Sequence, residues 1–82
     1  MTKITNIGEL LNEMNPESRE NRNYTHIEVY IEDPNLPKYE IIRNPKANWK
    51  KKAEYYAKAY NDDCTLKTYN PIRIAGFTKT MI

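Results

Sequence analysis

The chain has very few of the residues on which catalytic, metal and disulfide sites depend. Its 82 residues include one cysteine, one histidine and two glycines. A single cysteine, Cys64, forms no internal disulfide and fits a reducing cytosol. No stretch approaches the roughly 20 apolar residues needed to cross a bilayer, and the first residues lack the apolar run of a signal peptide. We therefore expect a cytoplasmic protein.

The same scarcity argues against an enzyme. One histidine and one cysteine cannot form a structural zinc site, and glycines as far apart as Gly8 and Gly76 exclude a glycine-rich phosphate loop. Cys64 falls in an alternating apolar stretch, where a cysteine usually behaves as a small buried hydrophobe. His26 falls on the polar side of another such stretch. We expect no catalytic residue, no metal and no cofactor.

Charge is distributed unevenly along a chain that is long enough for one small domain, residues 1–82. Residues 1–42 carry eight acidic and four basic side chains, whereas residues 43–82 carry three acidic and nine basic ones. Seven tyrosines supply most of the aromatic residues. The charge split is typical either of a basic binding surface or of ordinary solvated faces.

The central stretch Asn44–Asn61 (NPKANWKKKAEYYAKAYN) predicts an amphipathic helix. Asn44 followed by Pro45 suits a helix start, since proline lacks the amide hydrogen that would be unpaired there. A helical stripe predicted to be buried contains Trp49, Ala53, Tyr56, Ala57 and Tyr60.

The remaining elements follow from periodicity and turn residues. A short helix is predicted over residues 6–14, because Asn6 and Glu9 have capping-box spacing and apolar residues recur at helical intervals. Residues 16–23 are wholly polar and predict an exposed loop. Alternation predicts strands over residues 25–32, 38–43, 64–69 and 72–77, with a turn at residues 70–71.

The order α-β-β-α-β-β predicts an α+β domain in which two helices cover one face of a mostly antiparallel four-stranded sheet. The other face would present polar side chains from the 25–32 strand to solvent, including Glu28 and Tyr30. Strand order and oligomeric state, monomer or homodimer, stay open.

The outward side of the central helix is the candidate binding site. Lys51, Tyr55 and Lys58 lie one above another at i, i+4 and i+7, and Lys50 flanks them. Lysines neutralise phosphates and tyrosines stack on bases, which would suit a nucleic acid. Tyrosine is also a favoured anchor in protein interfaces. The simplest alternative is a solvated face, in which Glu54 pairs with lysines at i±4.

Two segments resemble a known group of proteins. Ile4–Met14 (ITNIGELLNEM) resembles the first helix of small uncharacterised proteins from phages and prophages of low-GC Gram-positive bacteria. Ala53–Phe77 (AEYYAKAYNDDCTLKTYNPIRIAGF) resembles their later half. Anti-CRISPR proteins are similar in length, α+β character and lack of enzymatic residues, although many that imitate DNA are strongly acidic and this chain is net basic.

The resemblance implies a non-enzymatic inhibitor in the host cytoplasm. Its partner would be a host or defence protein, with a CRISPR effector nuclease as the concrete case. Contacts would come from Lys51, Tyr55 and Lys58, with Lys50, and from the open sheet face with Tyr30 and Glu28. The alternative is a small nucleic-acid-binding accessory protein that uses the basic helix 45–61.

Overall fold

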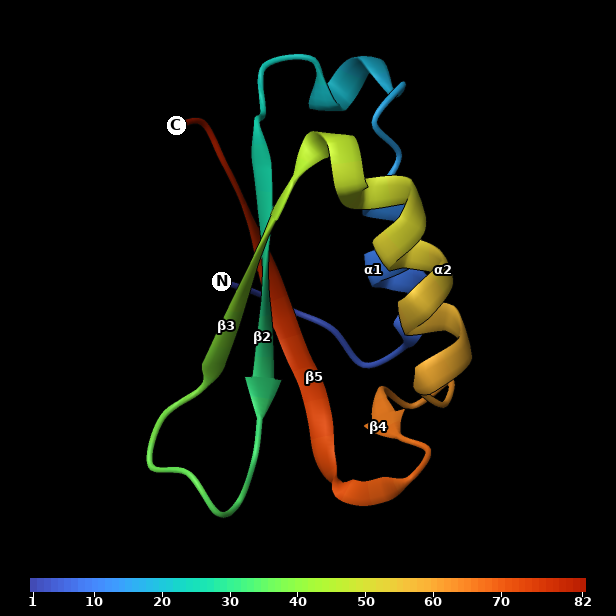
Figure 1. Cartoon of the computed structure of the whole chain (residues 1–82), viewed down its shortest axis with the longest axis vertical. Coiled ribbons are helices and arrows are strands. Elements are labelled where there is room, and N and C mark those ends of the chain that lie inside the picture. Colours follow the sequence, from blue (N-terminus) through green and yellow to red (C-terminus); the bar gives the residue numbers. More distant parts are fainter.

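The computed structural model describes residues 1–82, which form two layers, a sheet and a pair of helices (Figure 1). The elements in chain order are β1 (Thr2–Lys3), α1 (Ile7–Glu13), the 3-10 turn η1 (Arg19–Asn21), β2 (His26–Glu32), β3 (Glu40–Pro45), the 3-10 turn η2 (Lys46–Asn48), α2 (Trp49–Ala59), β4 (Thr65–Leu66) and β5 (Tyr69–Thr80).

The sheet confirms the predicted α+β class and its mostly antiparallel pairing. Its order is β1-β5-β2-β3, with β4 also paired to β5, so the sheet has five strands. Strand β5 is 12 residues long and pairs with β1, β2 and β4. β1 was not predicted, because two residues are too few to show alternation.

The hairpin of β2 and β3 confirms the two strands predicted from alternation. Ile27 and Val29 are fully buried and lie opposite Asn44 and Ile42 on β3. β3 forms one outer edge of the sheet. Its backbone therefore has no partner strand on the side away from β2.

The predicted strands 64–69 and 72–77 were wrong in their boundaries. The chain reverses at residues 67–68, since Leu66 pairs with Tyr69. The next pair is Thr65 with Arg73, so residues 70–72 of β5 form a bulge between the two pairs. Pro71 has no amide hydrogen to donate. It is tolerated inside β5 because the register shift leaves it without a paired residue on β4. Asn70-Pro71 is typical of a turn, but the turn lies three residues earlier in the structure.

The predicted start of the central helix at Asn44 and Pro45 was also wrong. Both residues belong to β3, and α2 begins at Trp49 after the η2 turn. Asn44 is buried, and its carbonyl oxygen accepts a hydrogen bond of 2.9 Å from the Trp49 indole nitrogen. The strand continues to Pro45 because this tertiary contact and the pairing of Asn44 with Ile27 outweigh the local capping preference.

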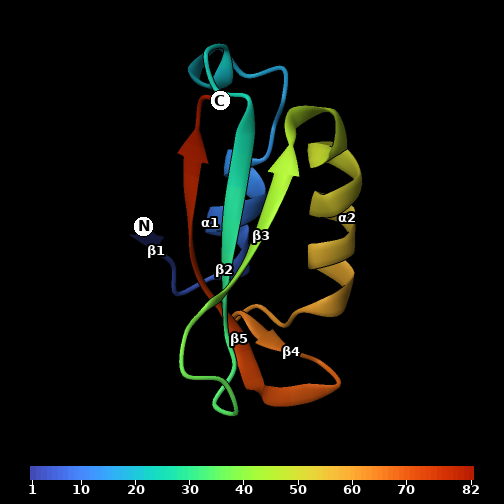
Figure 2. The same ribbon diagram turned by 60° about the vertical axis from the view of Figure 1, so that its left-hand side comes forward.

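Both helices lie on the same face of the sheet, as predicted, with α1 on the β5 side and α2 on the β3 side (Figures 1 and 2). The predicted cap of α1 is confirmed: the Asn6 side-chain oxygen accepts a hydrogen bond of 2.7 Å from the Gly8 amide. The Glu9 carboxylate accepts from the Thr5 amide and hydroxyl.

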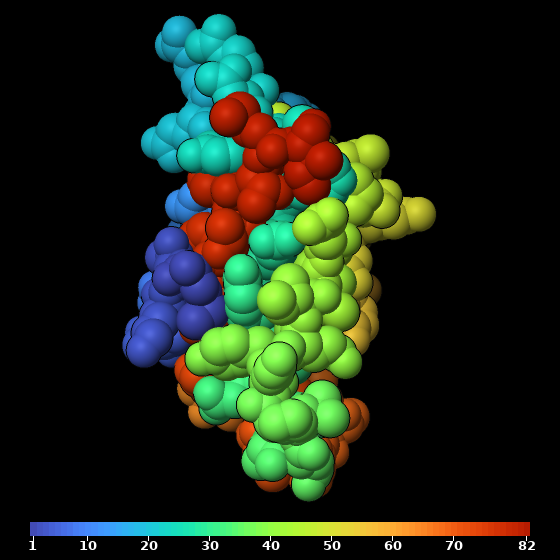
Figure 3. Space-filling view, turned by 90° about the vertical axis from the view of Figure 1, so that its left-hand side faces the viewer, coloured from blue at the N-terminus to red at the C-terminus, as the bar shows by residue number.

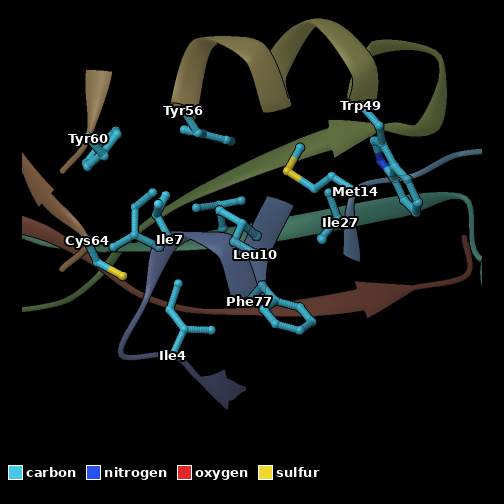
Figure 4. Packing of buried hydrophobic residues seen from close by; sticks show 12 residues of the cluster. Ile4, Ile7, Leu10, Met14, Ile27, Trp49, Tyr56, Tyr60, Cys64 and Phe77 are labelled. Atoms are coloured by element: carbon cyan, nitrogen blue, oxygen red, sulfur yellow. The ribbon is translucent and has the colours of Figure 1, made fainter. Parts of the chain in front are cut away.

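The core lies between the two layers and confirms most of the predicted apolar stripe of α2 (Figure 4). Trp49, Tyr56 and Tyr60 are buried and Ala53 is partly buried. Ala57, placed in the same stripe, is exposed. The stripe is narrower than predicted because Ala57 lies at its margin, where α2 has no neighbour.

The polar segment 16–23 was predicted to be an exposed loop without a core contribution, which is wrong for one residue. Asn21 is buried, and its side-chain amide donates to the carbonyl oxygens of Glu13 (3.1 Å) and Asn15 (2.8 Å). The Lys79 ammonium donates to the Asn21 side-chain oxygen at 2.8 Å and pairs with the Glu13 carboxylate. These bonds join the end of α1 to β5.

Neither helix has the length and apolar character required to cross a membrane.

Candidate functional site: the outer face of α2 and the groove beside β3

The structure places the three predicted binding residues of α2 on its exposed face. Lys51, Tyr55 and Lys58 are all exposed, and Tyr55 keeps half of its surface accessible despite its size. Neither Lys51 nor Lys58 has an acidic partner within 4.0 Å. Their charge is therefore not neutralised within the fold, and the intrahelical pairing expected between Glu54 and Lys58 does not form.

The flanking lysines behave differently. Lys50 lies 3.8 Å from the Glu17 carboxylate, with both side chains 80% exposed, so this ion pair contributes little. The Lys52 ammonium lies over the rings of Tyr55 and Tyr56, at 5.0 and 5.3 Å from their centroids. Lys52 is thus held beside Tyr55 by cation–π contacts.

Glu28 and Tyr30 lie on the opposite, open face of the sheet, which Figure 3 shows. Glu28 is bound to Arg43 at 3.1 Å, with only 15% of its side chain exposed. Tyr30 packs edge-on against Tyr39, with 5.9 Å between ring centroids. The structure therefore does not bring these two residues together with the α2 lysines, because the sheet separates them.

A groove that the sequence did not predict lies between α2 and the half of the β2–β3 hairpin nearest its turn. It has a volume of about 300 Å³. Seven of its ten lining residues are hydrophobic: the lining consists of Ile31, Asp33, Glu40, Ile42, Lys52, Tyr55, Tyr56, Tyr60, Leu66 and Ile72. Tyr55 and Lys52 connect this groove to the exposed face of α2.

Two tyrosines of the groove carry perturbed hydroxyl groups. Burial, followed by the charges that Tyr55 and Tyr56 would carry, raises the pKa of Tyr60 from 10.0 to about 12. Burial also raises the pKa of Tyr56, against the hydrogen bond from Asn44, which lowers it. Both hydroxyls are therefore neutral at physiological pH and act as hydrogen-bonding groups in an otherwise apolar groove.

The structure does not bring Cys64 and His26 together. His26 pairs with Thr80 at one end of β5, whereas the Cys64 carbonyl accepts a hydrogen bond from Ile74, six residues back along that strand. Cys64 is buried as predicted, in a turn with φ of 74° rather than in a strand, and burial raises the pKa of its thiol. No cluster of three or more potential metal ligands is present.

Comparisons with protein-family models, curated protein sequences and solved structures find no match for this chain.

Proposed function

We propose that this protein is a non-enzymatic interaction protein that binds another protein and inhibits it by occupying a site on its surface. The observation that supports this best is the position of Tyr55. Its ring is half exposed on α2, between the unpaired Lys51 and Lys58 and the rim of the apolar groove. A half-exposed tyrosine beside a groove, ringed by charge, is typical of an interface anchor.

The resemblance to phage and prophage proteins suggests the identity of the partner. We propose a host or defence protein, with a CRISPR effector nuclease as the concrete case. Occupying a surface requires shape and charge but no catalytic group, and Cys64 and His26 offer no paired arrangement. The open sheet face with Tyr30 is a separate surface and would contribute only if the partner reached around β3.

The test is affinity capture from a host lysate, performed with and without nuclease, using the wild-type protein and a Lys51→Glu/Lys58→Glu variant. We expect a protein to be captured in both conditions and the variant to weaken capture by about tenfold, a cost of roughly 1.4 kcal/mol. Since both side chains are exposed, the variant should unfold at the wild-type denaturant concentration.

A matched control is Lys3→Glu/Lys67→Glu. It changes the net charge equally, at exposed lysines that lie outside α2. Full capture by the α2 variant, or equal loss in both variants, would contradict the proposed role of α2.

A nucleic-acid-binding accessory protein is the second candidate, and the unpaired Lys51 and Lys58 support it. Against it, the Lys52 ammonium already lies over the Tyr55 ring, on which a base would have to stack. Capture that disappears after nuclease treatment would favour this candidate over the first.

A further inference from the structure

The outer edge of β3 presents an ordered set of unpaired backbone groups. The Lys46 amide donates to the Thr25 carbonyl at 2.9 Å, and Pro45, which has no amide hydrogen, lies opposite His26. Since the N–H and C=O groups of successive residues in a strand point to alternate sides, residues 40, 42 and 44 direct theirs toward β2. Ile41 and Arg43 therefore direct theirs away from the sheet.

The groove lies directly beside this edge, on the helix side. A strand added at β3 would place every second side chain on that side, opposite Glu40, Ile42 and Asn44. The side chain opposite Ile42 would enter the groove and meet Tyr55 on its rim. The cavity, about 300 Å³, is large enough for one aromatic or large aliphatic side chain.

Charge along the groove is polarised. The side-chain amide nitrogen of Asn44 lies 3.4 Å from the Tyr56 hydroxyl. The Lys52 ammonium lies over the Tyr56 ring, so the end of the groove near Asn44 is positively charged. Asp33 and Glu40 mark the other end. A complementary strand carries an acidic side chain at the first end, an apolar one in the middle and a basic one at the last.

A second copy of this chain does not fit that edge. α2 lies beside β3 on the helix side of the sheet (Figure 2), so pairing β3 with its own copy would bring two α2 helices into nearly the same space. Packed helices need about 8–10 Å between their axes, which is about twice the spacing of neighbouring strands. The edge therefore suits a strand that carries no covering helix.

We propose that β3 and the groove together bind an extended segment of another protein by antiparallel strand addition, with the sequence pattern acidic–x–apolar–x–basic. This inference rests on the proposed function and names the part of the partner that is recognised. Hydrogen bonds with Ile41 and Arg43 would hold the segment, and the alternate side chains would select it. Pro45 would end the pairing, because it offers no donor.

The probe is a synthetic peptide, TDTFTKT, added to the isotopically labelled full chain and followed by backbone amide NMR. We expect the amides of Ile41 and Arg43 to shift and to exchange more slowly with solvent, together with shifts of Tyr55 and Lys52. The control peptide TKTFTDT has the same composition but exchanges the two charged positions, so that its lysine faces Lys52 and its aspartate faces Glu40. It should bind about five-fold more weakly, the cost of losing two exposed ion pairs.

Two variants separate backbone pairing from side-chain contact. Ile41→Pro removes the outward amide, and we expect it to weaken peptide binding by about tenfold, the cost of one lost hydrogen bond and the strain beside it. Ile41→Thr keeps the amide and the strand propensity and should bind like the wild type. Equal effects of the two variants, shifts confined to the open face, or a concentration-dependent dimer would overturn the proposal.

Failure of this inference is distinguishable from failure of the proposed function. Capture of a protein by the wild type but not by Lys51→Glu/Lys58→Glu, without any response of Ile41 and Arg43 to the peptide, would reject strand addition and retain the interaction role of α2. If Ile41→Pro loses its native amide dispersion, slowed exchange at Ile41 and Arg43 in the wild-type protein remains the decisive measurement.

Discussion

Trp49 connects the two layers of the fold. Its side chain is fully buried, and its indole nitrogen donates to the Asn44 carbonyl at the end of β3. We expect Trp49→Ala to lower the free energy of unfolding by about 3–5 kcal/mol, because it leaves a large cavity and removes the hydrogen bond to Asn44. Urea denaturation checks this. A variant at the exposed Ala57, such as Ala57→Ser, should stay within about 0.5 kcal/mol of the wild type. A wild-type midpoint for Trp49→Ala would contradict the buried position.

The raised pKa of Tyr60 predicts that the folded protein loses stability at alkaline pH. Its pKa in the folded protein, about 12, exceeds the reference value of 10.0, so the folded state retains a proton that the unfolded state releases between these values. The stabilisation is fully present below pH 10 and is lost as the pH rises toward 12. Denaturation midpoints measured across this range should fall, and Tyr60→Phe should flatten the fall. An unchanged slope in the variant would assign the loss to other groups.

For single residues, burial could be predicted from the sequence where hydrophobicity alone determines it. Trp49, Tyr56 and Tyr60 were correctly predicted to be buried, because large rings at helical spacing form one apolar face. Asn44 and Asn21 were not, because a polar residue is buried only when distant partners satisfy it. No local pattern reveals such partners.

Among the elements, the contact of β1 with β5 depends on Gly76. A Cβ atom at Gly76 would lie 2.2 Å from the Thr2 carbonyl oxygen, a backbone atom that can move only with β1 itself. We expect Gly76→Ala to destabilise the protein by about 1–3 kcal/mol and to accelerate hydrogen exchange of the Ile4 amide, which donates to the Ala75 carbonyl. In a chain lacking residues 1–3, the same substitution should cost much less. An equal cost in both backgrounds would locate the strain elsewhere.

Element types were largely predictable and their boundaries were not. Alternation identified β2 and β3, and helical spacing identified α1 and α2. The β4–β5 turn was misplaced because Pro71 is usually a turn residue, and only the pairing of Thr65 with Arg73 shows that it lies in a bulged strand. Pairing between distant segments decides such cases.

For the whole molecule, the salt dependence of partner binding distinguishes the two candidate functions. Contacts to phosphates release counterions, so a nucleic-acid complex should weaken with a slope of about −0.7 to −0.9 in log K against log salt for each contact. A complex that depends on Tyr55 and the apolar groove should show a much shallower dependence. Titration calorimetry with the captured partner at several salt concentrations provides the measurement. A slope of several units for a nuclease-resistant complex would contradict the proposed role of the groove.

Of the candidate site, the exposed face of α2 could be predicted from the sequence and the groove could not. The exposed face of α2 follows from its own periodicity, and Lys51, Tyr55 and Lys58 are where it placed them. The groove joins residues from five elements, whose proximity depends on the strand order. The sheet order also explains why Glu28 and Tyr30 lie on a different surface.

Strand β5 has a consequence for how the protein is made. It occupies the middle of the sheet between β1 and β2, yet the ribosome adds it after every other element of the fold. Until residues 69–80 have emerged, β2 lacks its second neighbouring strand, and α1 lacks its contact with β5. The sheet therefore cannot be completed before β5 has been synthesised, and until then chaperones and proteases have access to the apolar side chains of the incomplete domain.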